Sequence, residues 1–123
     1  MIIAHISIIP VGTGSTSISN FIVEAVETLK KSGLNVMITP MGTVLEAENL
    51  EKIFKSIEEC HEALHKIGVK RLLTLVLIDD RRDVERSMVD KIRSIEKKLG
   101  YSFQQCNNDD RDDDATNEHE GET

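Results

Sequence analysis

The residues best suited to binding a small molecule gather in the stretch 38–47, Ile-Thr-Pro-Met-Gly-Thr-Val-Leu-Glu-Ala. Thr39 and Thr43 supply hydroxyls that both donate and accept hydrogen bonds, and Glu46 supplies a carboxylate. The Pro-Met-Gly segment between them is typical of a turn, because proline fixes its own φ and Gly42 accepts a positive φ. Since β-capable apolar residues flank the turn, the stretch predicts a hairpin that carries a ligand site.

A charged run at residues 79–83, Asp-Asp-Arg-Arg-Asp, directly follows the most apolar stretch of the chain. One interpretation is a solvated loop in which Asp83 caps a following helix. The other is a polar wall of a ligand or subunit site, because the guanidinium groups of Arg81 and Arg82 are directional donors. The two interpretations have equal support from the sequence.

The segment 12–17, Gly-Thr-Gly-Ser-Thr-Ser, has two glycines and four hydroxyls just before a helical pattern. This composition is typical of phosphate-binding loops, but the spacing fits neither the P-loop nor the dinucleotide pattern, and the P-loop lysine is missing. We therefore interpret the segment as a strand-to-helix loop that ends in a Ser or Thr N-cap.

His61 and His65 lie one helical turn apart and match the letters H-E-x-x-H of zinc proteases. The sequence downstream offers no evident third ligand, and Leu64 between them is needed for the core. We interpret both as surface histidines, and we expect no metal site.

The elements that must position these residues follow from hydrophobic periodicity and from Gly and Pro breakers. We expect strands at 2–11, 34–39, 44–47 and 69–78, and helices at 18–32, 49–67 and 84–99, with Asn49 as an N-cap. The order β-α-β-β-α-β-α contains the split βαβ pattern of a ferredoxin-like α+β sandwich, with one additional C-terminal helix.

The strand at 69–78 is apolar on both faces. Leu73, Leu75 and Leu77 point one way, and the opposite face carries Leu72, Thr74, Val76 and Ile78. In an antiparallel sheet covered by helices on one side only, the second apolar face needs a partner. We expect a subunit interface there.

Charge is distributed unevenly along the chain. Residues 1–100 hold 14 Lys and Arg against 14 Asp and Glu, so the net charge of −7 comes from residues 101–123. A neutral body, in a chain of which only 3% is aromatic, argues against binding to nucleic acid or to an anionic membrane. We expect a domain at 1–100 and a disordered acidic tail at 101–123.

The two cysteines, Cys60 and Cys106, do not form a disulfide framework, and Cys60 falls on a helical apolar face. The N-terminus lacks the basic region of a signal peptide, and no apolar run reaches membrane-spanning length. These features predict a cytoplasmic protein.

Three segments, 7–17, 41–47 and 78–83, together resemble the thiamine-binding protein family, with matching spacing over residues 1–99. The resemblance implies a ferredoxin-like fold and a homo-oligomer, commonly a tetramer built from dimers. It also implies a ligand, thiamine or its hydroxymethylpyrimidine moiety, and no catalytic activity.

For such a ligand we expect Glu46 to meet the thiazolium cation or accept from the exocyclic amine, while Gly42 lets the backbone approach closely. The full set of expected ligand-binding residues is Ser7, Thr39, Gly42, Thr43, Glu46, Arg81 and Arg82. Each hydroxyl taken singly is more often an ordinary strand residue.

Other classes of function stay open. One alternative is a regulatory oligomer of ACT-like architecture that senses another small metabolite, and a second is a purely structural assembly module. An enzyme is disfavoured, because no nucleophile, base and orienting group come together in the sequence, and His5 is the only histidine near the expected sheet. We expect no cofactor.

Overall fold

The computed structural model describes residues 1–102. Its elements are β1 (Ile2–Val11), α1 (Ser19–Lys31), β2 (Asn35–Thr39), β3 (Gly42–Ala47), α2 (Leu50–Lys66), β4 (Arg71–Asp79) and α3 (Met88–Leu99). The predicted element order is confirmed, and β1 has the predicted bounds.

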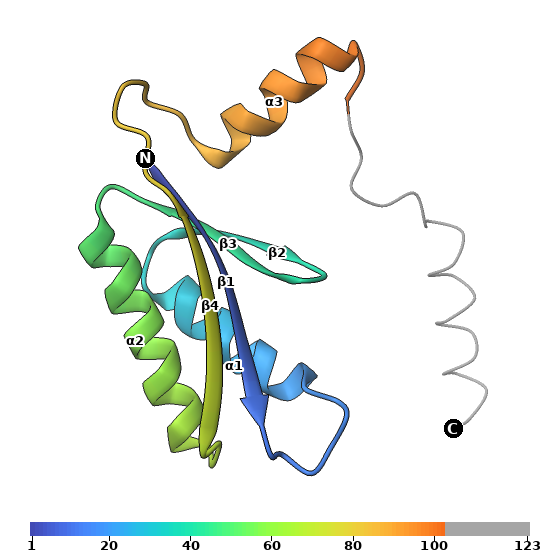
Figure 1. Ribbon diagram of the computed structural model, residues 1–123, viewed down its shortest axis with the longest axis vertical. Helices are drawn as coiled ribbons and strands as arrows, with labels where there is room; N and C mark the ends of the chain where they lie inside the picture. Colours follow the sequence, from blue (N-terminus) through green and yellow to red (C-terminus); the bar gives the residue numbers. More distant parts are fainter. Residues whose placement is uncertain (103–123) are drawn as a thin grey trace, which may run out of the picture. The chain divides into compact units, whose positions relative to one another are not determined.

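The four strands form one antiparallel sheet with the order β2-β3-β1-β4. α1 and α2 pack against each other and cover one face of this sheet (Figure 1). This α+β arrangement, with two split βαβ units, is consistent with a ferredoxin-like fold.

The core lies between the sheet and these two helices and is aliphatic. Ala4 and Leu45 come from the central strands, Ile53 and Leu64 come from α2, and all four are at most 1% exposed. Along β1, Ala4 and its buried neighbours alternate with partly exposed residues, because successive side chains of a strand point to opposite faces.

The opposite face of the sheet carries exposed leucines. Leu73, Leu75 and Leu77 of β4 are 46%, 66% and 72% exposed, as the alternation along the sequence predicts. Ile3, His5 and other members of the same face lie on the neighbouring strand β1. We call this surface the open face.

Helix starts are the part of the fold that the sequence predicts least well. Asn49 caps α2 as predicted, since its side chain accepts a hydrogen bond of 2.9 Å from the Lys52 N–H. The predicted Ser or Thr cap of α1 is wrong, because Ile18 is the N-cap and no side chain caps it. The hydroxyl of Ser17 interacts with Ser19 instead.

α3 begins at Met88, later than the predicted residue 84. Ser87 and Asp90 bond each other's backbone N–H in a reciprocal capping arrangement, which fixes the start of the helix there. Asp83 does not act as the cap, because its carboxylate pairs with Arg81.

Residues 1–91 form one compact unit, and a second unit begins at Ile92. The predicted acidic tail lies almost entirely at residues 103–123, outside the described residues, so its disorder and the boundary at residue 100 stay predictions. None of the helices within residues 1–102 combines the length and the apolar character that a membrane span requires.

Candidate functional site

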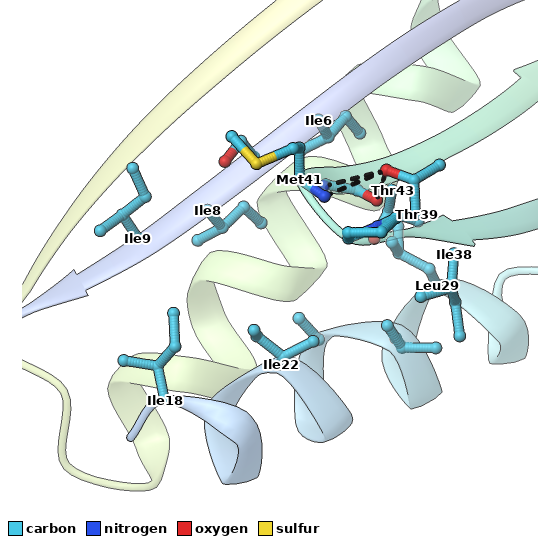
Figure 2. A pocket seen from close by; sticks show the side chains of 15 residues that line it. Ile6, Ile8, Ile9, Ile18, Ile22, Leu29, Ile38, Thr39, Met41 and Thr43 are labelled. Atoms are coloured by element: carbon cyan, nitrogen blue, oxygen red, sulfur yellow. Dashed lines mark hydrogen bonds between the residues drawn. The ribbon is translucent and has the colours of Figure 1, made fainter. Parts of the chain in front are cut away.

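A cavity of about 140 Å³ lies between α1 and the tip of the β2–β3 hairpin. Most of its wall is aliphatic. Figure 2 shows Ile18, the N-cap of α1, and Ile22 of α1 facing Ile6 and Ile8 of β1, with Met41 of the turn nearby. The helical periodicity identified the α1 residues only as core, yet Ile22 is 42% exposed and stands at the cavity.

The polar groups of the cavity come from β1 and the hairpin. Ser7, Thr39, Gly42 and Thr43 all contribute to its lining, so the structure brings four of the expected ligand-binding residues together. Thr43 lies directly opposite the buried Ile6 in the register of β1 and β3, which places it on the helix-covered side of the sheet.

The hydroxyl of Thr39 is used to shape the turn. Its Oγ1 accepts from the N–H groups of Met41 and Gly42, at 3.4 Å and 3.2 Å, and donates to the Gly42 carbonyl at 2.8 Å. Its proton is therefore committed to the turn, which leaves Thr43 as the lining residue whose hydroxyl can donate to a ligand on the helix-covered side. Ser7 lies opposite Leu75 in the register, so its side chain is on the open face and only its backbone can border the helix-covered side.

Gly42 is required for a close approach and not for the positive φ that the turn pattern predicts. It is not among the glycines with positive φ. A Cβ at this position would lie 2.7 Å from the His5 Nε2 and 2.8 Å from the Ile6 carbonyl oxygen. The hairpin can therefore sit against β1 only with glycine here.

The edge of β1 is unpaired beside the cavity. The register between β1 and β3 ends at Ile6 and Thr43, whereas β1 continues alongside β4 as far as Val11. On the hairpin side, residues 7–9 therefore have no strand partner, and all three line the cavity.

The cavity wall is uncharged. Its lining consists of aliphatic residues, Met, Pro, Gly, Ser and Thr, with no Asp, Glu, Lys, Arg or His. Recognition at this site depends on shape, apolar contact and neutral hydrogen bonds.

Glu46 is absent from this lining. It is 4% exposed, and its Oε1 accepts from the Asn35 Nδ2 at 2.9 Å while its Oε2 accepts from the Met88 N–H at 2.8 Å. Both carboxylate oxygens thus tie β3 to its neighbour β2 and to the first residue of α3. The structure separates Glu46 from the hydroxyls with which the sequence grouped it.

Arg81 and Arg82 lie at a second, polar cavity of about 370 Å³, which also includes Asn49 at the start of α2. Each guanidinium pairs with a neighbouring carboxylate, Arg81 with Asp83 and Arg82 with Asp80. These hydrogen bonds lower the pKa of both Asp80 and Asp83.

The expected ligand set is therefore split in space. Asp79, at the end of β4, pairs with Ile3 near the start of β1, while the hairpin tip meets β1 at Ile6. The arginines follow Asp79 in sequence, and they line the second cavity rather than the first.

The two histidines of α2 connect this helix to the following strand. The His61 Nε2 lies 2.6 Å from the Thr74 Oγ1, and the His65 Nδ1 lies 2.6 Å from the Val69 carbonyl oxygen. Within residues 1–102, no three His, Cys, Asp or Glu side chains gather as metal ligands. The sequence pattern placed both histidines on the helix but could not show these partners.

Sequence comparison supplies the remaining observation. The profile of a family described as thiamine-binding protein matches residues 4–96. The chain belongs to this family. A UPF0045 protein of Methanothermobacter thermautotrophicus is 43% identical over 99 residues, covering 80% of this chain and all of that protein. The UPF0045 protein YqgV of Bacillus subtilis is 36% identical over 103 residues, covering 80% and 98% of the two chains.

Solved structures of related proteins share the fold of this chain. The crystal structure of MJ1052 from Methanocaldococcus jannaschii has a TM-score of 0.71 at 36% identity, and covers 78% of this chain and 96% of that one. A Thermotoga maritima protein described in terms of thiamine biosynthesis or salvage has a TM-score of 0.65 at 20% identity, with 76% and 97% covered. At that identity the second likeness establishes the fold alone.

Proposed function

We propose that this member of the thiamine-binding protein family is a non-catalytic binding protein for thiamine or its hydroxymethylpyrimidine moiety. The observation that carries the proposal is the aliphatic cavity at the hairpin, where Ser7, Thr39, Gly42 and Thr43 gather. Small-molecule sites are concave and mostly apolar, with a few placed polar groups, and this cavity has that character.

The same cavity argues against the alternative of an ACT-like sensor for an amino acid or another charged metabolite. An ionised ligand that loses its water needs charged or multiple polar partners, and the wall has no ionisable side chain. The same limit applies to the thiazolium cation of thiamine, which must therefore stay in contact with water. The wall also lacks a general base or nucleophile of the usual kinds apart from hydroxyls, which favours binding without catalysis.

Assembly is part of the proposal. The open face exposes Leu73, Leu75 and Leu77 side by side on one strand, and an apolar patch of this kind typically marks a protein interface. We propose a homo-oligomer, with a tetramer as the expected state, that acts in the cytoplasm. The buried free thiol of Cys60 is compatible with a reducing compartment.

The test is calorimetric titration of the full chain with thiamine and with hydroxymethylpyrimidine, using wild type and the isosteric variant Thr43→Val. Loss of one neutral hydrogen bond costs about 0.5–1.5 kcal/mol, so we expect a roughly two- to tenfold weaker affinity. Thr16→Val is the matched control, because Thr16 is exposed in the loop before α1 and is absent from the cavity lining.

Absence of binding by both compounds at millimolar concentration would refute the proposed ligand class. Equal affinity of Thr43→Val and wild type would leave the proposed ligand class standing, and it would show that Thr43 does not contact the ligand.

A further inference from the structure

We propose that His61 and His65 of α2 form a site for an exchangeable divalent ion of the zinc, nickel and copper group, bound through one imidazole nitrogen of each residue. The site is separate from the cavity at the hairpin, whose lining contains no histidine, and it goes beyond the proposed function. Three observations carry it: the spacing of the two rings, the hydrogen bonds at their other nitrogens, and the charge around them.

The spacing of the two rings follows from helical geometry. Residues four apart lie on the same face of a helix, and a histidine pair at this spacing can bind one metal ion. The ring centres of His61 and His65 are 6.3 Å apart, with 68° between the ring planes. Two imidazoles that bind one ion at about 2 Å have ring centres at most roughly 6.4 Å apart, so this pair can share an ion once the rings tilt toward each other by about 1 Å.

The hydrogen bonds of the two rings leave one nitrogen of each available. The Val69 carbonyl can only accept, so the His65 Nδ1, 2.6 Å away, carries a proton and the lone pair of the neutral ring is on Nε2. The His61 Nε2 lies 2.6 Å from the Thr74 Oγ1, and when that hydroxyl accepts, the lone pair of His61 is on Nδ1. Histidines that bind metals typically donate their other N–H to an oxygen atom, which fixes the tautomer and the ring orientation. Both rings therefore already have the outer hydrogen bond of a metal ligand.

The charge around the pair favours a cation. Glu58 and Glu62 are exposed and lie on the helix face of the histidines, because positions 58, 61, 62 and 65 follow the helical spacing. Between residues 56 and 69, Lys66 is the one basic side chain that is always charged. His65 is exposed and belongs to the last turn of α2, where the negative end of the helix dipole also attracts a cation.

The small number of protein ligands sets the affinity and the kind of ion. Within residues 1–102, no third His, Cys, Asp or Glu side chain joins the pair, so water must occupy the other coordination positions. We therefore expect a dissociation constant on the order of 1–100 µM, far weaker than that of a structural zinc site. Imidazole suits Zn²⁺, Ni²⁺ and Cu²⁺, whereas Mg²⁺ and Ca²⁺ prefer oxygen ligands. Because the two rings also hold Val69 and Thr74, a bound ion should stabilise the junction between α2 and β4.

The experiment is calorimetric titration of the full chain with Ni²⁺, and with Mg²⁺ as the oxygen-preferring control ion. We expect Ni²⁺ to bind wild type, and to bind His61→Gln and His65→Gln at least about tenfold more weakly, because each variant loses one of two ligands. His5→Gln is the matched control, since His5 lies on β1, and its Ni²⁺ affinity should stay within about twofold of wild type. Mg²⁺ should give no binding heat, and circular dichroism checks that each variant is folded.

Two measurements do not depend on how well the histidine variants fold. Ni²⁺ is paramagnetic, so in NMR spectra of wild type the ring C–H signals of His61 and His65 should broaden at lower Ni²⁺ concentration than those of His5. Ni²⁺ at about ten times its dissociation constant should also raise the melting temperature of wild type by roughly 5 °C.

Three results would overturn the inference: no Ni²⁺ binding by wild type at about 1 mM, equal affinity of wild type and both pair variants, or earlier broadening of the His5 signals. None of the probes is a thiamine compound, so these results leave the proposed function untouched.

Discussion

In the structure the side chain of Glu46 connects elements of the fold, although the sequence pattern suggests that it contacts a ligand. Its carboxylate is nearly inaccessible and accepts from both Asn35 and the N–H of Met88, at the positive end of α3. Removal of its charge should therefore affect folding more than ligand binding.

The first prediction is that Glu46→Gln lowers the free energy of unfolding by about 1–3 kcal/mol, because an amide cannot accept both hydrogen bonds. The affinity for hydroxymethylpyrimidine should change by less than about threefold. Chemical denaturation and calorimetry on the same variant measure the two effects. Tenfold weaker binding with unchanged stability would contradict this prediction and indicate that Glu46 contacts the ligand.

The second prediction concerns Gly42. Its substitution by Ala would place a Cβ 2.8 Å from the backbone oxygen of Ile6 and 2.7 Å from the His5 ring, and we expect a loss of about 1–3 kcal/mol in unfolding free energy. The double variant His5→Ala/Gly42→Ala is the matched control. Since the backbone contact remains, it should recover only part of the loss, and full recovery would show that the ring alone requires glycine.

The third prediction follows from Cys60, which is fully buried and whose thiol donates to the Ala25 carbonyl. Burial, with a smaller contribution from Glu59, raises the pKa of this thiol from 9.0 to about 11. The unfolded chain loses the proton near pH 9 while the folded chain keeps it. The stabilisation is therefore complete below that pH and is lost as pH rises toward 11.

Urea denaturation should show this loss as at most about 2–3 kcal/mol between pH 9 and pH 11. Cys60→Ala should have a flatter pH dependence in this range, whereas Cys106→Ala should behave as wild type. Identical pH profiles for wild type and Cys60→Ala would contradict the raised pKa.

At the scale of elements, the hydrophobic pattern predicts every strand and helix, because periods of 2 and 3.6 residues identify them independently of distant contacts. The start of α3 could not be predicted in the same way. Both Asp83 and Ser87 are plausible caps in sequence, and the pairing of Asp83 with Arg81 decides between them.

Only part of the candidate site could be predicted from the sequence, because the rest depends on contacts between residues far apart in the chain. Local turn chemistry gathers Thr39, Gly42 and Thr43, so the hairpin was visible from the sequence. Strand alternation places the side chains of Thr43 and Glu46 on opposite faces, because they are three residues apart. The point at which the β1–β3 register ends, and with it the unpaired edge of β1, depends on tertiary packing that no sequence period encodes.

At the scale of the whole molecule, the open face is the feature that a single chain leaves unexplained. Its helix-covered counterpart is buried, yet Leu75 and Leu77 are 66% and 72% exposed. Each buried leucine contributes roughly 1.5–3 kcal/mol, so the exposed leucines of several copies together can support a stable assembly.

The fourth prediction is that the full chain sediments as an oligomer, with a tetramer of 13.8 kDa chains as the expected state, and that Leu75→Lys/Leu77→Lys dissociates it. The variant should keep its fold, because both side chains are largely exposed within one chain and introduce no buried charge. Phe54→Lys is the matched control, since Phe54 is a 52% exposed apolar residue on α2, away from the open face. Light scattering gives the oligomeric state of the three proteins, and circular dichroism checks that each is folded. A monomeric wild type at micromolar concentration would contradict the prediction. Dissociation caused equally by Phe54→Lys would also mean that the open face does not hold the subunits together.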